Sequence, residues 1–297
     1  MTQPAEQKAY FAGVFDRAAP TYDQTGVEFF ARVGAELVAA AGLRPGDRVL
    51  DVGSGRGANL FPAAAAVGPE GSVIGVDLAP GMVAQTAAEI ERRGLTNARV
   101  RIGDAETPDF PEGGFDAVLA GLILYFLPDA PAAGRAYARL LRPGGRLAVS
   151  TFQEMSTEEQ ASRQRIADGL RPLWPRLAAA PTTGTPPEAR LRTRESIADL
   201  LRPAGFTDVT FAERDVPLRF TTLDQYWQWM WSQGMRAMLE RIPADRLGAA
   251  QDVIAEELDR LREDGVITLR MRVRLTTATK PISRRRWRTS GPGSAPP

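Results

Sequence analysis

The chain has 297 residues, 43% of them hydrophobic and 25% charged, which is the balance of an ordinary soluble globular protein. It has neither cysteine nor histidine, and this excludes disulfides, thiolate or imidazole metal sites, cysteine nucleophiles and histidine-based catalysis. The formal net charge of +1 gives no long-range attraction to nucleic acid or anionic lipid.

The N-terminal segment lacks the features of a signal peptide, because residues 1–15 contain no basic region followed by an apolar stretch. The longest apolar runs, 61–67 and 122–127, are far shorter than the ~20 residues that a membrane-spanning helix needs. We therefore expect a cytoplasmic protein.

The first predicted element is an aromatic-rich amphipathic stretch over residues 1–33, which we interpret as a helical lid. From residue 34 to residue 151, short apolar strands alternate with helices. The strands are predicted at 48–52, 72–77, 98–102, 115–120 and 146–150, and the helices at 59–67, 80–93 and 130–141. Strands that are apolar on both faces and joined by helices are typical of a doubly wound, mostly parallel α/β sheet.

The remaining residues complete this core and add to it. Residues 152–194 are predicted to form a helical insertion that caps the substrate, with a helix at 157–177 and a Pro/Thr-rich loop at 180–187. Residues 195–281 return to the core, with a helix at 195–202, strands at 208–213 and 267–277, and a helical insertion at 223–264. The sheet then has seven strands. The tail at 282–297 is basic, then Pro/Gly/Ser-rich, and is expected to be disordered.

The most informative motif is the glycine-rich sequence at residues 49–57, Val-Leu-Asp-Val-Gly-Ser-Gly-Arg-Gly. It follows a predicted strand and begins a helix, so its glycines allow the backbone to turn sharply and to approach a ligand closely. The spacing Gly53-x-Gly55-x-x-Ala58 also fits a dinucleotide-binding fingerprint, which leaves a nicotinamide oxidoreductase as one interpretation.

Acidic residues at the strand ends favour a cationic nucleoside over a dinucleotide. Asp51, on the strand before the glycines, would repel a pyrophosphate. Asp77 ends the second strand, where its carboxylate can accept hydrogen bonds from ribose hydroxyls, and Asp104 follows the third strand beside the same crevice. No Ser/Tyr/Lys proton relay is recognisable, since Lys8 and Lys280 are the only lysines, and this further disfavours an oxidoreductase.

These motifs resemble those of the class I S-adenosylmethionine-dependent methyltransferases. The resemblance rests on residues 51–57, Val76-Asp77, 103–105 and 140–145, and it covers about residues 33–150. Tyr22-Asp23 is similar to a Tyr-Asp pair of the small-molecule branch, which serves secondary metabolism and antibiotic biosynthesis. The resemblance implies a Rossmann-like methyltransferase fold with helical lid insertions, and S-adenosylmethionine as the cofactor.

The resemblance also implies roles for individual residues. Gly53 and Gly55 would pack against the methionine part of the cofactor, Asp77 would hold the ribose, and Asp104 would lie at the adenine edge. Met82, on the adenine, and Tyr22, over the methionine part, are equally open to a packing role. The predicted cofactor-binding residues are Tyr22, Asp51, Gly53, Ser54, Gly55, Asp77, Leu78, Met82, Gly103, Asp104, Ala105, Gly121 and Leu122.

Methyl transfer from a sulfonium needs mainly alignment of the reacting atoms, because the leaving group is neutral. An oxygen or nitrogen acceptor of high pKa also needs a base, and many O-methylating relatives use the histidine that this chain lacks. Tyr22, Tyr125 and Glu154 are the weak candidates for that role. The sequence favours an acceptor whose O, N or C atom is acidic or nucleophilic enough to react by positioning.

The acceptor pocket is expected beyond the carboxyl ends of the strands, beneath aromatic-rich lid elements. Four aromatic residues within 226–231 are too many for one helical face, so we expect some to line a pocket; a packed core of the lid is an equally open interpretation. Such a roof suits a hydrophobic or aromatic small molecule. The predicted pocket residues are Phe11, Phe15, Phe29, Tyr125, Trp174, Trp227 and Trp231.

Two alternatives stay open at this stage. A non-methylating cyclase or a cofactor-scaffold protein of the same fold would carry the same cofactor motifs. The arginines between residues 163 and 194 would suit an anionic group, although acidic neighbours nearly balance them and favour a solvated face. We expect a small-molecule substrate, no nucleic-acid or membrane partner, no metal site, and a monomer or homodimer; Mg²⁺ held by two or three carboxylates would leave no clear signal.

Overall fold

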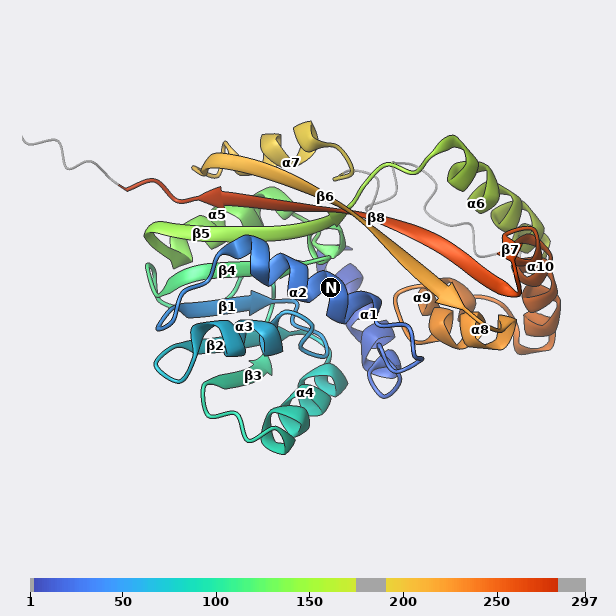
Figure 1. The fold of residues 1–297 in the computed structure, drawn as a ribbon, viewed down its shortest axis with the longest axis horizontal. Coiled ribbons are helices and arrows are strands. Elements are labelled where there is room, and N and C mark those ends of the chain that lie inside the picture. Colours follow the sequence, from blue (N-terminus) through green and yellow to red (C-terminus); the bar gives the residue numbers. More distant parts are fainter. Residues whose placement is uncertain (1–2, 175–190, 283–297) are drawn as a thin grey trace, which may run out of the picture.

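The computed structural model describes residues 3–174 and 191–282, and its centre is an eight-stranded sheet in the order β3-β2-β1-β4-β5-β8-β6, with β7 paired to β8 (Figure 1). The strands are Arg48–Val52 (β1), Ser72–Asp77 (β2), Ala98–Ile102 (β3), Phe115–Gly121 (β4), Leu141–Phe152 (β5), Thr207–Phe220 (β6), Arg262–Glu263 (β7) and Val266–Thr279 (β8). The doubly wound, mostly parallel fold is confirmed. The predicted count of seven is one too few, because the two-residue β7 has no pattern that a sequence can reveal.

Helices cover both faces of this sheet. On one face lie α2 (Phe29–Ala41), α3 (Leu60–Val67) and α4 (Pro80–Arg92), and on the other lie α5 (Ala130–Leu140) and α7 (Arg194–Leu201). The central strands β1 and β4 are therefore buried almost throughout, which accounts for their continuous apolar sequences. Strands β1 to β5 pair in parallel, so their carboxyl ends meet at one edge of the sheet.

Strands β6 and β8 continue beyond that edge as an antiparallel ribbon that runs from the pair Thr207–Thr279 to the pair Phe220–Ile267 (Figure 1). At its far end are α8 (Leu223–Trp231), α9 (Arg236–Leu239) and α10 (Leu247–Asp259), and α6 (Thr157–Leu170) packs on α10. We call these four helices the lid. Both strands are longer than predicted, because exposed charged residues interrupt their apolar pattern.

Several predicted boundaries differ from the structure. The predicted N-terminal lid holds α1 (Gln3–Ala18), but its limit at residue 33 falls within α2, a helix of the core. The region 223–264 contains three helices, a short 3-10 turn and β7. The helix predicted at 157–177 ends at Leu170, since Pro172 cannot continue it. The loop predicted at 180–187 and all but the first residue of the tail lie outside the described residues.

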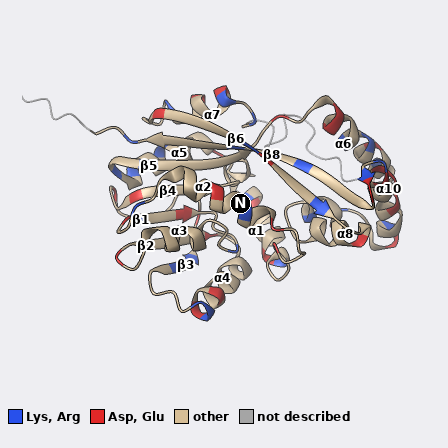
Figure 2. Ribbon diagram, viewed as in Figure 1, with Lys and Arg blue, Asp and Glu red and all other residues tan. Residues whose placement is uncertain are grey.

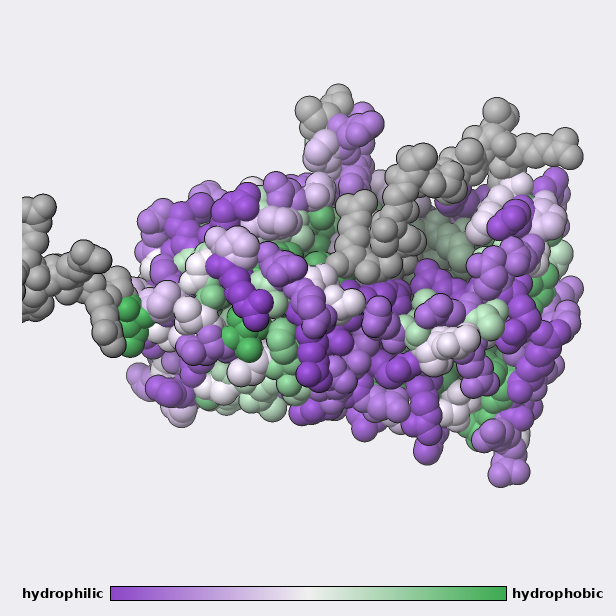
Figure 3. All heavy atoms as spheres, turned by 90° about the horizontal axis from the view of Figure 1, so that it is seen from above, coloured by the Kyte–Doolittle hydropathy of each residue, from purple (hydrophilic) through white to green (hydrophobic). Residues whose placement is uncertain are grey.

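Charged residues of both signs are scattered over the described part of the fold (Figure 2). Seen from above, the outer surface is mainly hydrophilic, and apolar residues are visible in a recess between the core and the lid (Figure 3). Among the described residues, no helix is both long and apolar enough to cross a membrane.

Candidate active site

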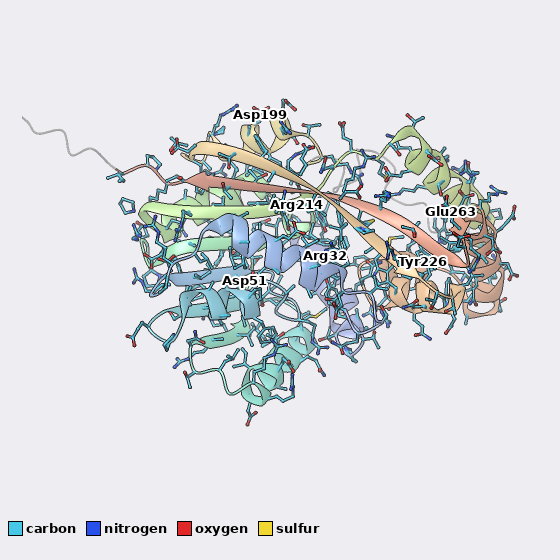
Figure 4. All side chains as sticks on the ribbon, in the orientation of Figure 1. Arg32, Asp51, Asp199, Arg214, Tyr226 and Glu263 are labelled. Carbon is cyan, nitrogen blue, oxygen red and sulfur yellow. The ribbon has the colours of Figure 1, made fainter. Side chains whose placement is uncertain are left out.

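A cavity of about 1200 Å³ lies between the carboxyl edge of the sheet and the lid. Its wall is formed by the loops after β1, β2, β3 and β4, by α1, and by residues of the lid and of the β6–β8 ribbon. In Figure 4, the label Asp51 marks β1 on the core side, and the label Tyr226 marks α8 on the lid side. One continuous space therefore connects the glycine-rich loop with the aromatic helix α8.

The loop after β1 forms one end of the cavity. Gly53 has a φ of 65°, and a Cβ there would lie 2.5 Å from Cγ1 of Ile123, so a larger residue does not fit. Gly55 donates its backbone N–H to Oδ2 of Asp77 at 2.8 Å, and the N–H of Ala79 binds Oδ1 at 2.9 Å. These bonds fix the carboxylate at the end of β2, and burial raises the pKa of Asp77. The carboxylate lies in the cavity wall and has acceptor capacity left for a ligand hydroxyl.

Beneath this loop, the carboxylate of Asp51 is only half satisfied. The residue is fully buried, and its Oδ1 accepts a hydrogen bond of 2.9 Å from Nδ2 of Asn59. Its Oδ2 has no hydrogen-bond partner among the described residues. Burial, with a smaller contribution from Asp77, raises the pKa of Asp51 to about 7. An unpaired buried acceptor beneath a glycine-rich loop fits a cationic ligand above it.

The loop after β3 contributes a second acidic group. Asp104 Oδ2 lies 2.7 Å from Nζ of Lys8 in α1, and Lys8 also binds Oε1 of Glu106 at 2.8 Å. Burial acts to raise the pKa of Asp104, but the bond from Lys8 and other bonds outweigh it and hold that pKa below its ordinary value. The hydroxyl of Tyr137 in α5 donates to the carbonyl oxygen of Ala105 at 2.7 Å, which fixes this loop against the core.

Aromatic side chains line the middle of the cavity. Phe15 and Tyr22 pack against Ala79 and Met82 beside the Asp77 loop. Phe15 also meets Phe126 edge-on, with 5.2 Å between ring centroids. Burial raises the pKa of Tyr22 well above its ordinary value. The Tyr22 hydroxyl therefore stays protonated at neutral pH and is a poor base.

One face of α8 lines the lid side of the cavity. Tyr226, Trp229 and Met230 are buried and belong to its wall. Trp227 and Trp231 lie outside that wall, because their positions in the helix turn them to another face, where their rings pack 6.2 Å apart. Two aromatic residues of the segment 226–231 therefore line the cavity, Tyr226 and Trp229. They are not Trp227 and Trp231, the two that the sequence analysis names as pocket residues.

The structure brings most of the predicted site residues to this cavity. Tyr125 and Glu154 line it, as do the predicted pocket residues Phe11, Phe15, Phe29 and Trp174. The predicted cofactor-binding residues in its wall are Tyr22, Gly53, Ser54, Gly55, Asp77, Leu78, Met82, Asp104, Ala105, Gly121 and Leu122.

Two predicted cofactor-binding residues are not part of the wall. Asp51 lies behind Asn59, and Gly103 packs against Val76, where a Cβ would be 3.0 Å from that side chain. Many other residues line the cavity that the sequence analysis does not name, among them Asn59, Phe126 and Gln233, because none of these belongs to a recognisable motif.

The arginines between residues 163 and 194 divide into two groups. Arg163 and Arg192 line the cavity. The others that the structure describes form ion pairs, which are Arg165–Glu257 at 2.5 Å, Arg171–Asp168 at 3.2 Å and Arg194–Glu213 at 2.9 Å. Within residues 3–174 and 191–282, no group of three or more acidic side chains is placed to hold a metal ion.

Comparison with known proteins identifies relatives along most of the chain. Residues 49–145 match the methyltransferase domain family. The nocamycin O-methyltransferase of Saccharothrix syringae is 41% identical over 268 residues, covering 86% of this chain and 93% of that protein. The aklanonic acid methyltransferase DauC of Streptomyces sp. (strain C5) is 46% identical over 149 residues, covering 50% of this chain and 68% of that protein.

Solved structures of lower identity share the fold. The YcgJ protein of Bacillus subtilis superposes with a TM-score of 0.57 at 21% identity, covering 84% of this chain and 98% of that one. The cyclase SpnF gives a TM-score of 0.55 at 21% identity, covering 85% and 82%. Because a relative 41% identical extends over nearly its whole length, this chain belongs to the class I methyltransferases, in their small-molecule branch. It is a methyltransferase enzyme, and the family resemblance seen in the sequence is confirmed.

Proposed function

We propose that this enzyme transfers a methyl group from S-adenosylmethionine to an acidic oxygen of a hydrophobic, aromatic small molecule in secondary metabolism. The observation that carries the proposal is the single cavity of about 1200 Å³, which joins the Asp77 loop to the aromatic face of α8. This space exceeds the ~300–1,000 Å³ of an ordinary ligand pocket and suits two ligands side by side. The names of the two relatives, an O-methyltransferase and a methyltransferase of an organic acid, support oxygen as the target.

The cofactor is proposed to occupy the end formed by the loops after β1, β2 and β3. When bound there, it supplies a methyl group on a positively charged sulfur. The Asp77 carboxylate, fixed by Gly55 and Ala79, accepts hydrogen bonds from the ribose hydroxyls. Asp104 and Ala105 face the nucleobase. Asp51 is buried beneath the loop, and a cationic ligand bound above it would favour the ionised form of its carboxyl group.

The acceptor is proposed to be ionised before it reacts, so that the wall does not have to supply a base. Burial raises the pKa of the Tyr22 hydroxyl well above its ordinary value, which makes this side chain a poor base. A carboxylic acid or an acidic enol or phenol is already deprotonated near neutral pH. Such an oxygen needs only alignment with the methyl group and exclusion of water, which the aromatic wall provides.

The test is methyl transfer from labelled S-adenosylmethionine to polycyclic carboxylic acids and to the matching alcohols, with S-adenosylhomocysteine quantified alongside. We expect labelled esters from the acids, at a rate that does not change with pH once the acid is ionised. Tyr22→Phe and Glu154→Gln should keep kcat close to that of the wild type. Tight binding of S-adenosylmethionine without label in any product would contradict the proposal and favour a non-methylating cyclase.

A further inference from the structure

The bend after α8 places an amide side chain among apolar and aromatic residues of the cavity wall. Gln233 lies in the bend between α8 and α9 and is only 8% exposed, yet it lines the cavity. The next residue, Gly234, faces the aromatic cluster, since a Cβ there would lie 3.5 Å from Cζ of Phe15 and 3.7 Å from Cζ of Phe126. Gln233 is therefore located where the lid meets the aromatic residues that border the Asp77 loop.

The side chain of Gln233 is held in one orientation. Its Oε1 accepts the backbone N–H of Met235 at 3.1 Å, which satisfies the oxygen and turns it toward the start of α9. The bend itself is fixed, because the N–H of Arg236 donates to the carbonyl oxygen of Gln233 at 2.9 Å and Nε of Arg236 donates to that of Trp231 at 2.9 Å. The amide Nε2 must then point away from Met235.

The Nε2 group of Gln233 donates to no other residue that the structure describes. An amide nitrogen whose two hydrogens lose their contact with water is unfavourable unless a ligand accepts them. Water can do so in the open cavity, but a bound acceptor displaces it. An acceptor that offers an oxygen at this point keeps the hydrogen bond, whereas an apolar group there leaves the amide unpaired.

We propose that Gln233 is a specificity-determining residue that binds the acceptor directly, donating from Nε2 to the oxygen of the acidic group that is not methylated. The inference rests on the proposed function, since it takes an ionised organic acid as the acceptor. A bond to a charged oxygen is stronger than one to a neutral oxygen, so Gln233 selects the acid over the alcohol. By holding one oxygen, it also orients the other toward the methyl group.

The decisive variant is Gln233→Glu, which keeps an acceptor for the N–H of Met235 but removes the donor and places a second negative oxygen in the cavity. If Gln233 only held the bend in place, this variant would bind acceptors as tightly as the wild type does. The matched control is Gln228→Glu, which makes the same charge change on an exposed residue of α8 outside the cavity wall. In the wild type, Gln228 donates to Asp224 at 2.7 Å.

The experiment titrates anthraquinone-2-carboxylate and 2-(hydroxymethyl)anthraquinone into protein saturated with S-adenosylhomocysteine, and it follows quenching of tryptophan fluorescence. Trp229 and Trp174 lie in the cavity wall and provide the signal. We expect Gln233→Glu to bind the carboxylate at least about tenfold more weakly than the wild type, and the alcohol with much less change. Gln228→Glu should bind both probes as the wild type does.

Equal carboxylate affinity in Gln233→Glu and the wild type would overturn the inference and leave the proposed function in place. Failure of the wild type to bind the carboxylate would instead overturn the acceptor class, and the role of Gln233 with it. The affinity for S-adenosylhomocysteine, measured on each variant, shows whether the variant is folded. If Gln233→Glu has lost its affinity for S-adenosylhomocysteine, Gln233→Met takes its place in the comparison, because it removes the same donor without adding a charge.

Discussion

The ammonium group of Lys8 lies 2.7 Å from the carboxylate of Asp104, and this contact attaches α1 to the loop after β3 in the cavity wall. Near the other end of α1, Arg17 makes two hydrogen bonds, of 2.8 Å and 2.6 Å, with Glu240, which follows α9 in the lid. The helix thus contacts both the core and the lid, and Phe11 and Phe15 on it line the cavity between them.

Replacement of Lys8 by methionine should loosen α1. The Lys8 ammonium binds both Asp104 and Glu106. Because Glu106 is only 8% exposed, loss of the ammonium leaves a buried carboxylate without that partner. We expect a loss of about 1.5–3 kcal/mol in the free energy of unfolding and faster hydrogen exchange in α1. Lys280→Met is the control, since the Lys280 ammonium donates to the carbonyl oxygen of Leu141 at 2.6 Å, far from α1. Equal exchange of α1 in both variants would refute the attachment.

Asp77→Ala should weaken the binding of S-adenosylmethionine by about 1.5–3 kcal/mol, as expected for the loss of charge-assisted hydrogen bonds. Asp116→Ala is a suitable control, because Asp116 is near the start of β4, at the opposite edge of the sheet, and is paired with Arg142 at 2.5 Å. Calorimetric titration measures both affinities. If Asp77→Ala binds the cofactor as Asp116→Ala does, Asp77 does not belong to the site.

The sequence was sufficient for the core because its signals are local. The strands β1 and β2 occupy their predicted positions, and the glycine motif fixes where the cavity begins. The inner face of α8 was harder to predict, because four aromatic residues obscure the polar face that Asp224 and Gln228 mark one turn apart. Trp229 faces the cavity and Trp227 does not. The orientation of Gln233 depends on the bend after α8, which only the three-dimensional structure reveals.

The buried carboxylate of Asp51 should make stability depend on pH. Its pKa is about 7 in the folded protein against an ordinary value of 3.8, so the folded state holds a proton that the unfolded state has lost between these values. The stability from this group is present below pH 4 and is lost as the pH rises through 7. The free energy of unfolding, relative to Asp51→Asn, should fall by on the order of 4 kcal/mol over that range. Parallel pH curves for the two proteins, in urea unfolding, would show that Asp51 does not titrate in this way.

Gly53 should be required for stability and for cofactor binding, and there are two separable reasons. One is its backbone conformation, and the other is the closeness of Ile123. Gly94 has nearly the same φ, 63° against 65°, but nothing lies within 4 Å of a Cβ there. Gly94→Ala should therefore lose only the conformational contribution, about 1 kcal/mol, and bind cofactor normally.

Gly53→Ala should lose a further ~1–3 kcal/mol, because the new methyl group forces Ile123 out of position. Ile123 lines the cavity, so its displacement should also weaken the binding of S-adenosylhomocysteine by about tenfold or more. Urea unfolding and calorimetric titration of the two variants separate the effects. Normal binding by Gly53→Ala would mean that the close approach of Ile123 is a matter of packing alone, and that the cofactor does not contact this part of the loop.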